Sequence, residues 1–348
     1  MKVALKEACP AAAPAEEDLV GRARALIPEL LARAPQCETD GKVPEETVAA
    51  FEDAGFFRIL QPASHGGYEM NPLALYRVLH EIGRGCPSSA WVAMVISVHN
   101  WEVALLDPRM ADDLWGQDDR TRTSSSYVPF GQAVAVDGGY RLSGRWRFSS
   151  GSDHCSWAFL GAWVPTGDGQ PADWRVFVVP RTDYEVVQGT WDVFGLAGTG
   201  SKDILVPGTF VPAYRSHSVG ETLKMDDIGL KTFTSPTYRY PFGTVFHYAV
   251  ASVIMGMALG ALDQFRTQLE GRVDHFRGQP VTANPLLRRR MAEAEAAVQS
   301  AISLQAADMA EMAGFIDRGE PIPVERRAVY VWHAAYAARQ CADAVTTV

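Results

Sequence analysis

The stretch SGRWRFSSGSDHCSWAFLGAWV, residues 143–164, consists of two aromatic-rich segments with a short polar run between them. Each aromatic segment, one around Trp146 and one around Trp157, has the residue types of a β-strand. The run SSGSDHCS at 149–156 separates them with small and polar residues. Two interpretations are open: the run lets the backbone approach a planar ligand whose polar edges meet hydroxyl groups, or it is a polar bulge at a sheet edge.

Outward from this stretch, the hydrophobic pattern changes twice along the chain. Residues 16–116 repeat apolar side chains at intervals of three and four, which is typical of helices. Residues 120–215 alternate with a period of two, and the Asp-Gly-Gly turn at 137–139 indicates a hairpin. After Pro241 the helical period returns in three long segments, expected at 243–276, at 285–316 and from 323 onward.

These patterns predict an α+β fold that is mainly α and has three domains. We expect an N-terminal helical domain at 1–119, a small antiparallel β-domain at 120–220 and a C-terminal helix bundle at 221–348.

Composition excludes several classes of protein. The chain has 348 residues, 47% of them hydrophobic, which is enough for a substantial core. Its 32 basic and 41 acidic side chains give a formal net charge of -9, and the basic triplet at 288–290 reads as a solvated helix face. We therefore expect no nucleic-acid partner.

The five cysteines are scattered and form no C-x-x-C pair, so neither a disulfide framework nor a zinc cluster is expected. The chain shows no signal peptide and no apolar run of the roughly 20 residues that a membrane span needs. A cytoplasmic protein without a membrane partner fits best.

Common nucleotide and hydrolase motifs do not fit. GLAGTGSKD at 195–203 places Ser before Lys, the reverse of a phosphate loop, and a strand is expected to follow it. G-x-S-x-G, H-E-x-x-H and a strand-linked G-x-G-x-x-G do not occur. His154 and Cys155 are adjacent, so they point to opposite faces of an extended chain and no metal site is expected.

Five longer segments, taken together and in this order, resemble the acyl-CoA dehydrogenase superfamily. More narrowly, they are similar to its flavin-dependent monooxygenase branch, the oxygenase components of two-component aromatic hydroxylases such as 4-hydroxyphenylacetate and steroid-ring phenol hydroxylases. The segments are GFFRILQPASHGGYE (55–69), CPSSAWVAMVISVHNWEVALLDP (86–108), SSSYVPFGQA (124–133), GGYRLSGRWRFSSGSDHCSWAFLGA (138–162) and TWDVFGLAGTGSKDILVPGTFVP (190–212).

The resemblance implies a flavin between the three domains and a specific reaction. Reduced FMN or FAD from a separate flavin reductase would react with O2 to a C4a-hydroperoxyflavin and hydroxylate an aromatic, phenolic or polycyclic small molecule. Two alternatives stay open: an acyl-CoA dehydrogenase acting on a thioester, and a non-catalytic member of the fold. The resemblance also implies a homo-oligomer, usually a tetramer.

The resemblance assigns roles to individual residues. His99 would hold or remove the proton of a phenolic substrate, Ser150 would bond the flavin near N5, and Ser125 would orient the peroxide or the substrate. The residues implied in catalysis are His99, Ser150 and Ser125; in cofactor binding, Ser124, Ser125, Ser126, Phe148, Ser149 and Ser150; in substrate binding, Trp91, His99, Phe242 and Phe246.

Some of these residues also have a plainer interpretation. Trp91, Phe242, Phe246 and Tyr248 suggest an aromatic-lined pocket, but the same residues could belong to the core. His154 is expected to be structural.

Two departures from the family pattern affect these expectations. Relatives continue after the helix with Cys341 into a segment carrying a further active-site histidine, whereas this sequence stops at Val348. Relatives often carry Arg where this chain has Ala197, which leaves the details of that flavin-side loop open.

Overall fold

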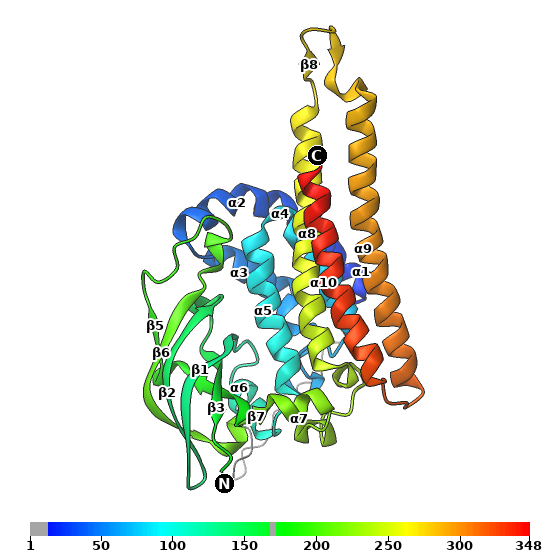
Figure 1. Ribbon diagram of the computed structural model, residues 1–348. Helices are drawn as coiled ribbons and strands as arrows, with labels where there is room; N and C mark the ends of the chain where they lie inside the picture. Colours follow the sequence, from blue (N-terminus) through cyan, green and yellow to red (C-terminus); the bar gives the residue numbers. More distant parts are fainter. Residues whose placement is uncertain (1–12, 168–171) are drawn as a thin grey trace.

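The computed structural model describes residues 13–167 and 172–348, and its three parts follow the order expected from the sequence (Figure 1). The N-terminal part is helical. Its helices are α1 (Glu16–Ala25), α2 (Ile27–Asp40), α3 (Glu45–Ala54), α4 (Pro72–Gly85), α5 (Pro87–Val103) and α6 (Arg109–Trp115).

A seven-stranded sheet follows, with the strand order β5-β6-β2-β1-β3-β4-β7. Its strands are β1 (Thr123–Val136), β2 (Gly139–Ser149), β3 (Trp157–Val164), β4 (Asp173–Pro180), β5 (Glu185–Val187), β6 (Lys202–Pro212) and β7 (Ser216–Ser218). Every pairing is antiparallel except that of β1 with β3, which is parallel.

The sheet order explains the polar run in the opening stretch. β2 returns antiparallel to β1 after a turn at Asp137-Gly138, so it ends beside the start of β1. The chain must then cross the start of β1 to begin β3 on its other side, and residues 150–156 make that crossing. We call these seven residues the β2–β3 crossover.

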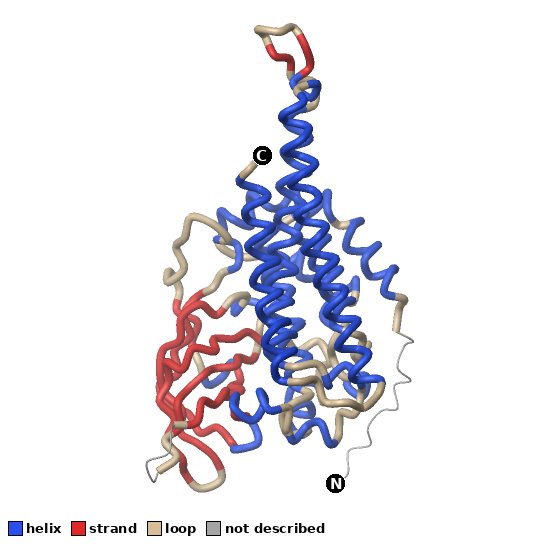
Figure 2. The backbone as a smooth tube through the Cα atoms, turned by 45° about the vertical axis from the view of Figure 1, so that its right-hand side comes forward, coloured by secondary structure: helices blue, strands red, loops and turns tan. Residues whose placement is uncertain are grey.

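Long helices form the C-terminal part and stand beside the sheet (Figure 2). They are α8 (Phe242–Leu269), α9 (Pro285–Asp317) and α10 (Val324–Thr346), preceded by the short α7 (Val219–Lys224). α8 ends seven residues before the expected 276, because Gly271 takes a left-handed φ of 73° and the chain turns into the hairpin of β8 (Val273–Asp274) and β9 (Gln279–Pro280).

α4 and α8 pack closely because glycines line their contact. A Cβ built on Gly83 would lie 2.9 Å from the Cα of Gly256, and one built on Gly260 would lie 2.6 Å from the carbonyl oxygen of Arg84. Any larger residue at these positions would push the helices apart.

α8 alone among the helices of the described residues is long and apolar enough to cross a membrane. However, 61% of its most apolar window is buried inside the protein, as in the core helix of a folded domain.

The sheet buries both of its faces. Phe159, Val176 and Val178 pack into the same core as the helices. Leu160 and Phe177 point the other way, into a second core that belongs to the sheet. The predicted fold class, mainly helical with a small sheet between helical parts, is confirmed.

Candidate active site

Helix α5 lies between the sheet and α8 and carries two of the expected site residues (Figure 1). Trp91 and His99 are eight residues apart, so they project from one side of the helix about 12 Å apart along its axis. α5 is apolar and almost wholly buried, because both the sheet and α8 cover it. A rigid, buried helix therefore fixes the spacing of these two side chains.

At the start of α5, Trp91 meets a group of hydroxyl side chains. Its indole N–H donates to Ser150 Oγ across 3.1 Å, and Ser150 Oγ lies 2.7 Å from Ser201 Oγ, which lies 2.7 Å from Thr199 Oγ1. The crossover packs against the helix here, since a Cβ on Gly151 would lie 2.9 Å from a methyl group of Val92. This hydroxyl cluster, Ser150, Ser201 and Thr199, joins α5 to the crossover and to the loop before β6.

The three expected serines at 124–126 do not share a face of the sheet. Ser125 pairs with Phe159, whose side chain packs into the helical core, so Ser125 faces the helices. Ser124 and Ser126 face the core of the sheet instead. There Ser124 Oγ accepts from Ser149 Oγ at 3.1 Å, and Ser126 Oγ donates to the carbonyl of Arg147 at 2.6 Å.

Phe148 lies at the end of β2 with a left-handed φ of 64°, uncommon for a residue with a side chain. Phe148 is 61% exposed, and its ring touches Trp191 edge to face, with ring centroids 6.1 Å apart. An exposed aromatic ring beside the hydroxyl cluster is available for stacking against a planar group.

The nearby loop at 196–200 is held by Glu38 of α2. Glu38 accepts hydrogen bonds from the backbone N–H groups of Ala197 and Gly198 at 2.9 and 3.3 Å. The loop is thus fixed through its backbone at Ala197 and Gly198.

His99 is buried among aromatic rings. Its imidazole stacks on Phe159 and Tyr127, with ring centroids 4.9 and 5.6 Å away, and Phe246 of α8 contacts it at 5.4 Å. Phe242 packs on Phe246 at 4.4 Å. We call the rings of Tyr127, Phe159, Phe242 and Phe246 the aromatic cage.

One carboxylate binds His99. Glu102, one turn later on α5 and fully buried, lies with Oε2 at 2.8 Å from His99 Nδ1, and Oε2 also accepts from the hydroxyl of Tyr127. Its other oxygen, Oε1, lies 2.7 Å from Nε2 of His217 on β7. Among the described residues, Nε2 of His99 has no hydrogen-bond partner.

The charge state of Glu102 follows from these contacts. Burial alone would raise the pKa of Glu102, but the hydrogen bonds from His217 and His99, together with the positive charge of His217, outweigh burial and lower this pKa to about 2. Burial beside Glu102 raises the pKa of Tyr127 well above its usual value, so Tyr127 stays neutral and donates. An ionised Glu102 can only accept, so His99 must carry its hydrogen on Nδ1, which leaves Nε2 as the basic nitrogen.

The structure therefore brings the expected residues into two groups joined by α5. Trp91 and Ser150 form one, with Phe148 beside it. His99 belongs to the other, with Ser125 on the same side of the sheet and with Phe242 and Phe246 from α8. Ser124, Ser126 and Ser149 join β1 to the end of β2 on the far side of the sheet.

Other expected residues lie outside both groups. Tyr248 faces α9, where it donates to Asp308 at 2.5 Å. His154 is buried against α3, with Nδ1 3.3 Å from Glu45 Oε2. The described residues contain no cluster able to hold a metal ion, and Cys9 lies outside the described residues.

The sequence reasoning missed Glu102, Tyr127 and His217. Glu102 carried a usable signal, because a residue three positions after His99 on a helix shares its face. His217 carried none, since its position depends on the pairing of the edge strand β7 with β4.

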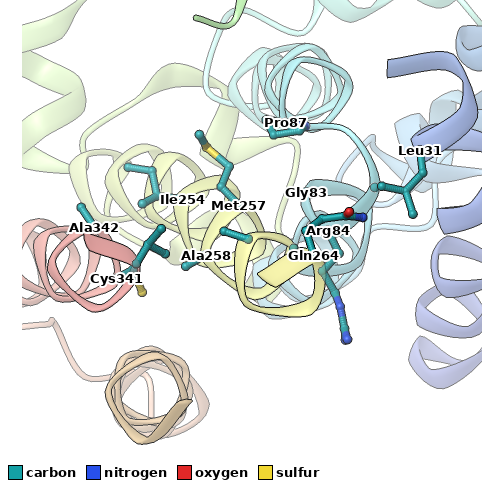
Figure 3. Close-up of a pocket in the computed structure, with 14 residues that line it drawn as sticks. Leu31, Gly83, Arg84, Pro87, Ile254, Met257, Ala258, Gln264, Cys341 and Ala342 are labelled. Atoms are coloured by element: carbon teal, nitrogen blue, oxygen red, sulfur yellow. The ribbon is translucent and has the colours of Figure 1, made fainter. Parts of the chain in front are cut away.

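A separate cavity of about 460 Å³ lies between α8, α10 and the end of α4 (Figure 3). Its walls are mostly apolar, with Ile254 and Met257 of α8 facing Cys341 and Ala342 of α10. It holds none of the expected site residues, so it is distinct from the two groups along α5.

The residues present fit a flavin. A flavin ring needs hydrogen-bond donors and acceptors along its polar edge and an apolar contact on its face. Ser150 and Ser125 supply hydroxyl groups, the indole of Trp91 holds Ser150 in place, and the exposed side chain of Phe148 lies near Ser150. The crossover also presents a Gly at 151, where the backbone packs closely on α5.

This arrangement of helices, sheet and helices is that of the acyl-CoA dehydrogenases. A model of the acyl-CoA dehydrogenase N-terminal domain matches residues 13–106, and a model of the C-terminal domain matches residues 248–348.

Individual relatives narrow the class. The chain is 38% identical over 307 residues to the oxygenase subunit HsaA of a flavin-dependent monooxygenase from Rhodococcus jostii, covering 88% of this chain and 80% of that protein. It is 32% identical over 300 residues to the oxygenase component of an FADH2-dependent resorcinol hydroxylase from a Rhizobium species, covering 84% and 72% of the two chains. The crystal structure of HsaA from Mycobacterium tuberculosis superposes with a TM-score of 0.87 at 34% identity, covering 95% and 85% of the two chains.

The chain belongs to the flavin-dependent monooxygenase branch of the acyl-CoA dehydrogenase superfamily. It is an enzyme, an oxygenase component of a two-component hydroxylase, and reduced flavin is its cofactor. The predicted family, the predicted enzyme class and the predicted cofactor are therefore confirmed. The comparisons do not favour an acyl-CoA dehydrogenase that acts on a thioester.

Proposed function

We propose that this enzyme hydroxylates a small phenolic substrate and that His99 is the base that takes the phenolic proton. The observation that carries the proposal is the state of His99: Nδ1 is held by the buried Glu102 carboxylate, and Nε2 is free of partners among the described residues. Removing the phenolic proton makes an aromatic ring electron-rich, which hydroxylation by an electrophilic oxygen requires.

The flavin would lie against the first group of residues. The hydroxyl of Ser150, which the indole of Trp91 holds in place, would bond its polar edge, and Phe148 would cover part of its ring. Ser125 would meet the flavin from the side of the second group. When bound, reduced FMN or FAD supplies the activation of O2. The protein holds the ring in place and keeps water away from it.

The substrate would lie against the aromatic cage, on the side of His99 Nε2. His99 stacks on Phe159 and Tyr127, and the aromatic rings around it suit another aromatic ring. Because α5 fixes His99 about 12 Å from Trp91, a small aromatic molecule between them would meet the base at one end and the flavin at the other.

The chemistry of Glu102 also argues against thioester oxidation. That reaction needs a carboxylate base, and Glu102 is the carboxylate beside the cage. With three hydrogen-bond donors and a pKa near 2, it is a poor proton acceptor.

A separate flavin reductase would supply the reduced cofactor, as the naming of the relatives as oxygenase components suggests. We further propose a cytoplasmic homo-oligomer, a tetramer in our expectation. The apolar cavity between α8 and α10, together with the exposed Trp332 and Tyr336 of α10, supports association of copies through the helix bundle. Light scattering of the purified protein tests the oligomer, and a monomer would contradict it.

The function is tested with chemically reduced FMN or FAD, added without oxygen and then mixed with O2 and resorcinol. We expect resorcinol to gain one oxygen atom from labelled O2. His99→Ala should lower the product yield at least about 100-fold while leaving flavin binding intact.

The matched control is His275→Ala, which removes an exposed histidine in the hairpin after α8 and should keep the wild-type yield. Full hydroxylation by the His99 variant would remove His99 from the mechanism.

A further inference from the structure

The hydrogen-bond network at His99 continues past Glu102 to the edge of the sheet. Nδ1 of His217 lies 2.8 Å from Thr222 Oγ1 on α7. Thr222 Oγ1 in turn donates to Asp227 Oδ1 at 2.7 Å and lies 3.1 Å from the carbonyl of Ser218. All these side chains are at least nine-tenths buried.

The hydrogens of this network can be counted. Thr222 has one hydroxyl hydrogen, and both of its other neighbours, the Asp227 carboxylate and the Ser218 carbonyl, only accept. Thr222 must therefore accept from His217, so Nδ1 of His217 carries a hydrogen. Nε2 of His217 faces the ionised Glu102 and must carry one as well.

The count of charges has a consequence for the reaction. With His217 positive and both Glu102 and Asp227 negative, the buried network holds one uncompensated negative charge. A proton that moves from a phenol to His99 leaves this total unchanged, and the imidazole that becomes positive lies 2.8 Å from the ionised Glu102.

We propose that Glu102 and His217 are positioning residues: doubly protonated His217 holds Glu102 ionised, and Glu102 holds His99 with Nε2 open toward a phenol. The phenolic O–H bond breaks, an Nε2–H bond forms, and the electron pair stays on the phenolate oxygen. Thr222 accepts the second hydrogen of His217 and donates its own hydrogen to Asp227. This inference rests on the proposed role of His99, but its tests need neither flavin nor oxygen.

The titratable and polar groups that face the network come from five segments. They are His99 and Glu102 of α5, Tyr127 of β1, His217 of β7, Thr222 of α7, and Asp226 and Asp227 after it. α8 contributes the uncharged rings of Phe242 and Phe246. Burial raises the pKa of Asp227, so acidification removes this charge before that of Glu102.

The first test is nitrogen-15 NMR of the wild-type protein with labelled histidine, in which His217→Gln identifies the His217 signals. We expect both ring nitrogens of His217 to be protonated at neutral pH and His99 to be protonated on Nδ1 alone. A neutral His217 would overturn the proposal, and the protonation states themselves are read from the wild-type protein.

The second test uses 4-nitrophenol, whose phenolate is yellow, as a probe bound to the flavin-free protein. We expect the bound probe to ionise at a lower pH than the free probe. In Glu102→Gln and His217→Gln the ionisation should move up by at least about one pH unit, a tenfold loss. Thr222→Val should move it in the same direction by less.

The control for Thr222→Val is Thr47→Val, since Thr47 is equally buried on α3 and its hydroxyl has no partner among the described residues. It should leave the ionisation unchanged. If bound 4-nitrophenol ionises at the wild-type pH in folded Glu102 and His217 variants, the proposal is overturned. If the wild-type protein shifts the ionisation of the probe but does not hydroxylate a phenol, only the proposed function is contradicted.

Discussion

The indole N–H of Trp91 donates to Ser150 Oγ across 3.1 Å, so the first turn of α5 is tied directly to the β2–β3 crossover. Helix and crossover thus share one hydrogen bond at the place where the flavin edge is proposed to bind. Ser150 is also bonded to Ser201, so its hydroxyl is held from two sides.

Replacing Trp91 with Phe removes this bond and keeps most of the ring. We expect the affinity for reduced flavin to fall about fivefold, the equivalent of about 1 kcal/mol for one hydrogen bond. Anaerobic titration followed by fluorescence measures it. Trp332→Phe on the exposed face of α10 is the control, and an equal loss there would show that the effect is not local.

Phe148→Ala should separate cofactor binding from stability. The ring is 61% exposed, so its removal should change the melting temperature little, while flavin affinity falls because a stacking surface is lost. Calorimetry and flavin titration on one preparation give both quantities. Unchanged affinity would place the flavin ring away from Phe148.

Gly256→Ala should destabilise the protein by about 1–3 kcal/mol, because the new methyl group would lie 2.7 Å from the carbonyl oxygen of His80. Urea unfolding measures the change. Gly21→Ala on α1, where no atom lies within 4 Å of the new methyl group, should be neutral or slightly stabilising. Similar losses in the free energy of unfolding at both positions would mean that the close contact between α4 and α8 is not the cause.

The pH dependence of stability should report on Glu102. Its pKa is lowered in the folded protein from 4.5 to about 2, so its contribution is complete above pH 4.5 and is lost as the pH falls toward 2. The contribution is on the order of 3 kcal/mol, since each pH unit corresponds to about 1.4 kcal/mol. Urea unfolding at pH 3 and pH 6 should show a smaller difference for Glu102→Gln than for the wild type. Equal differences would mean that another carboxylate dominates acid unfolding.

The sequence was sufficient for the fold because its periods are long and clear. The change from a helical to an alternating pattern near residue 120, and back after Pro241, matches the observed elements closely. The end of α8 was predicted too late, since the segment after Leu269 keeps helix-forming residues and only Gly271 signals the turn.

The candidate site was predictable only in part. Trp91 and His99 lie on one face of one helix, which spacing alone reveals. The division of Ser124, Ser125 and Ser126 between two faces was not foreseen, although strand alternation implies it. His217 could not be found, because its contact with Glu102 spans 115 residues and depends on the order of the strands.

The crossover at 150–156 spans the width of one strand, about 10 Å between the neighbours on either side. Seven residues could reach further than this, but the crossover is held along its length, since Ser150 is bonded to Trp91 and Ser201 and Lys202 donates to Asp153 at 2.6 Å. An inserted or deleted residue here would pull on β3, whose Phe159 lies against His99. The length of the crossover, at the proposed flavin end of α5, therefore affects the position of His99 at the proposed substrate end. We expect this enzyme to tolerate substitutions in the crossover but not insertions or deletions.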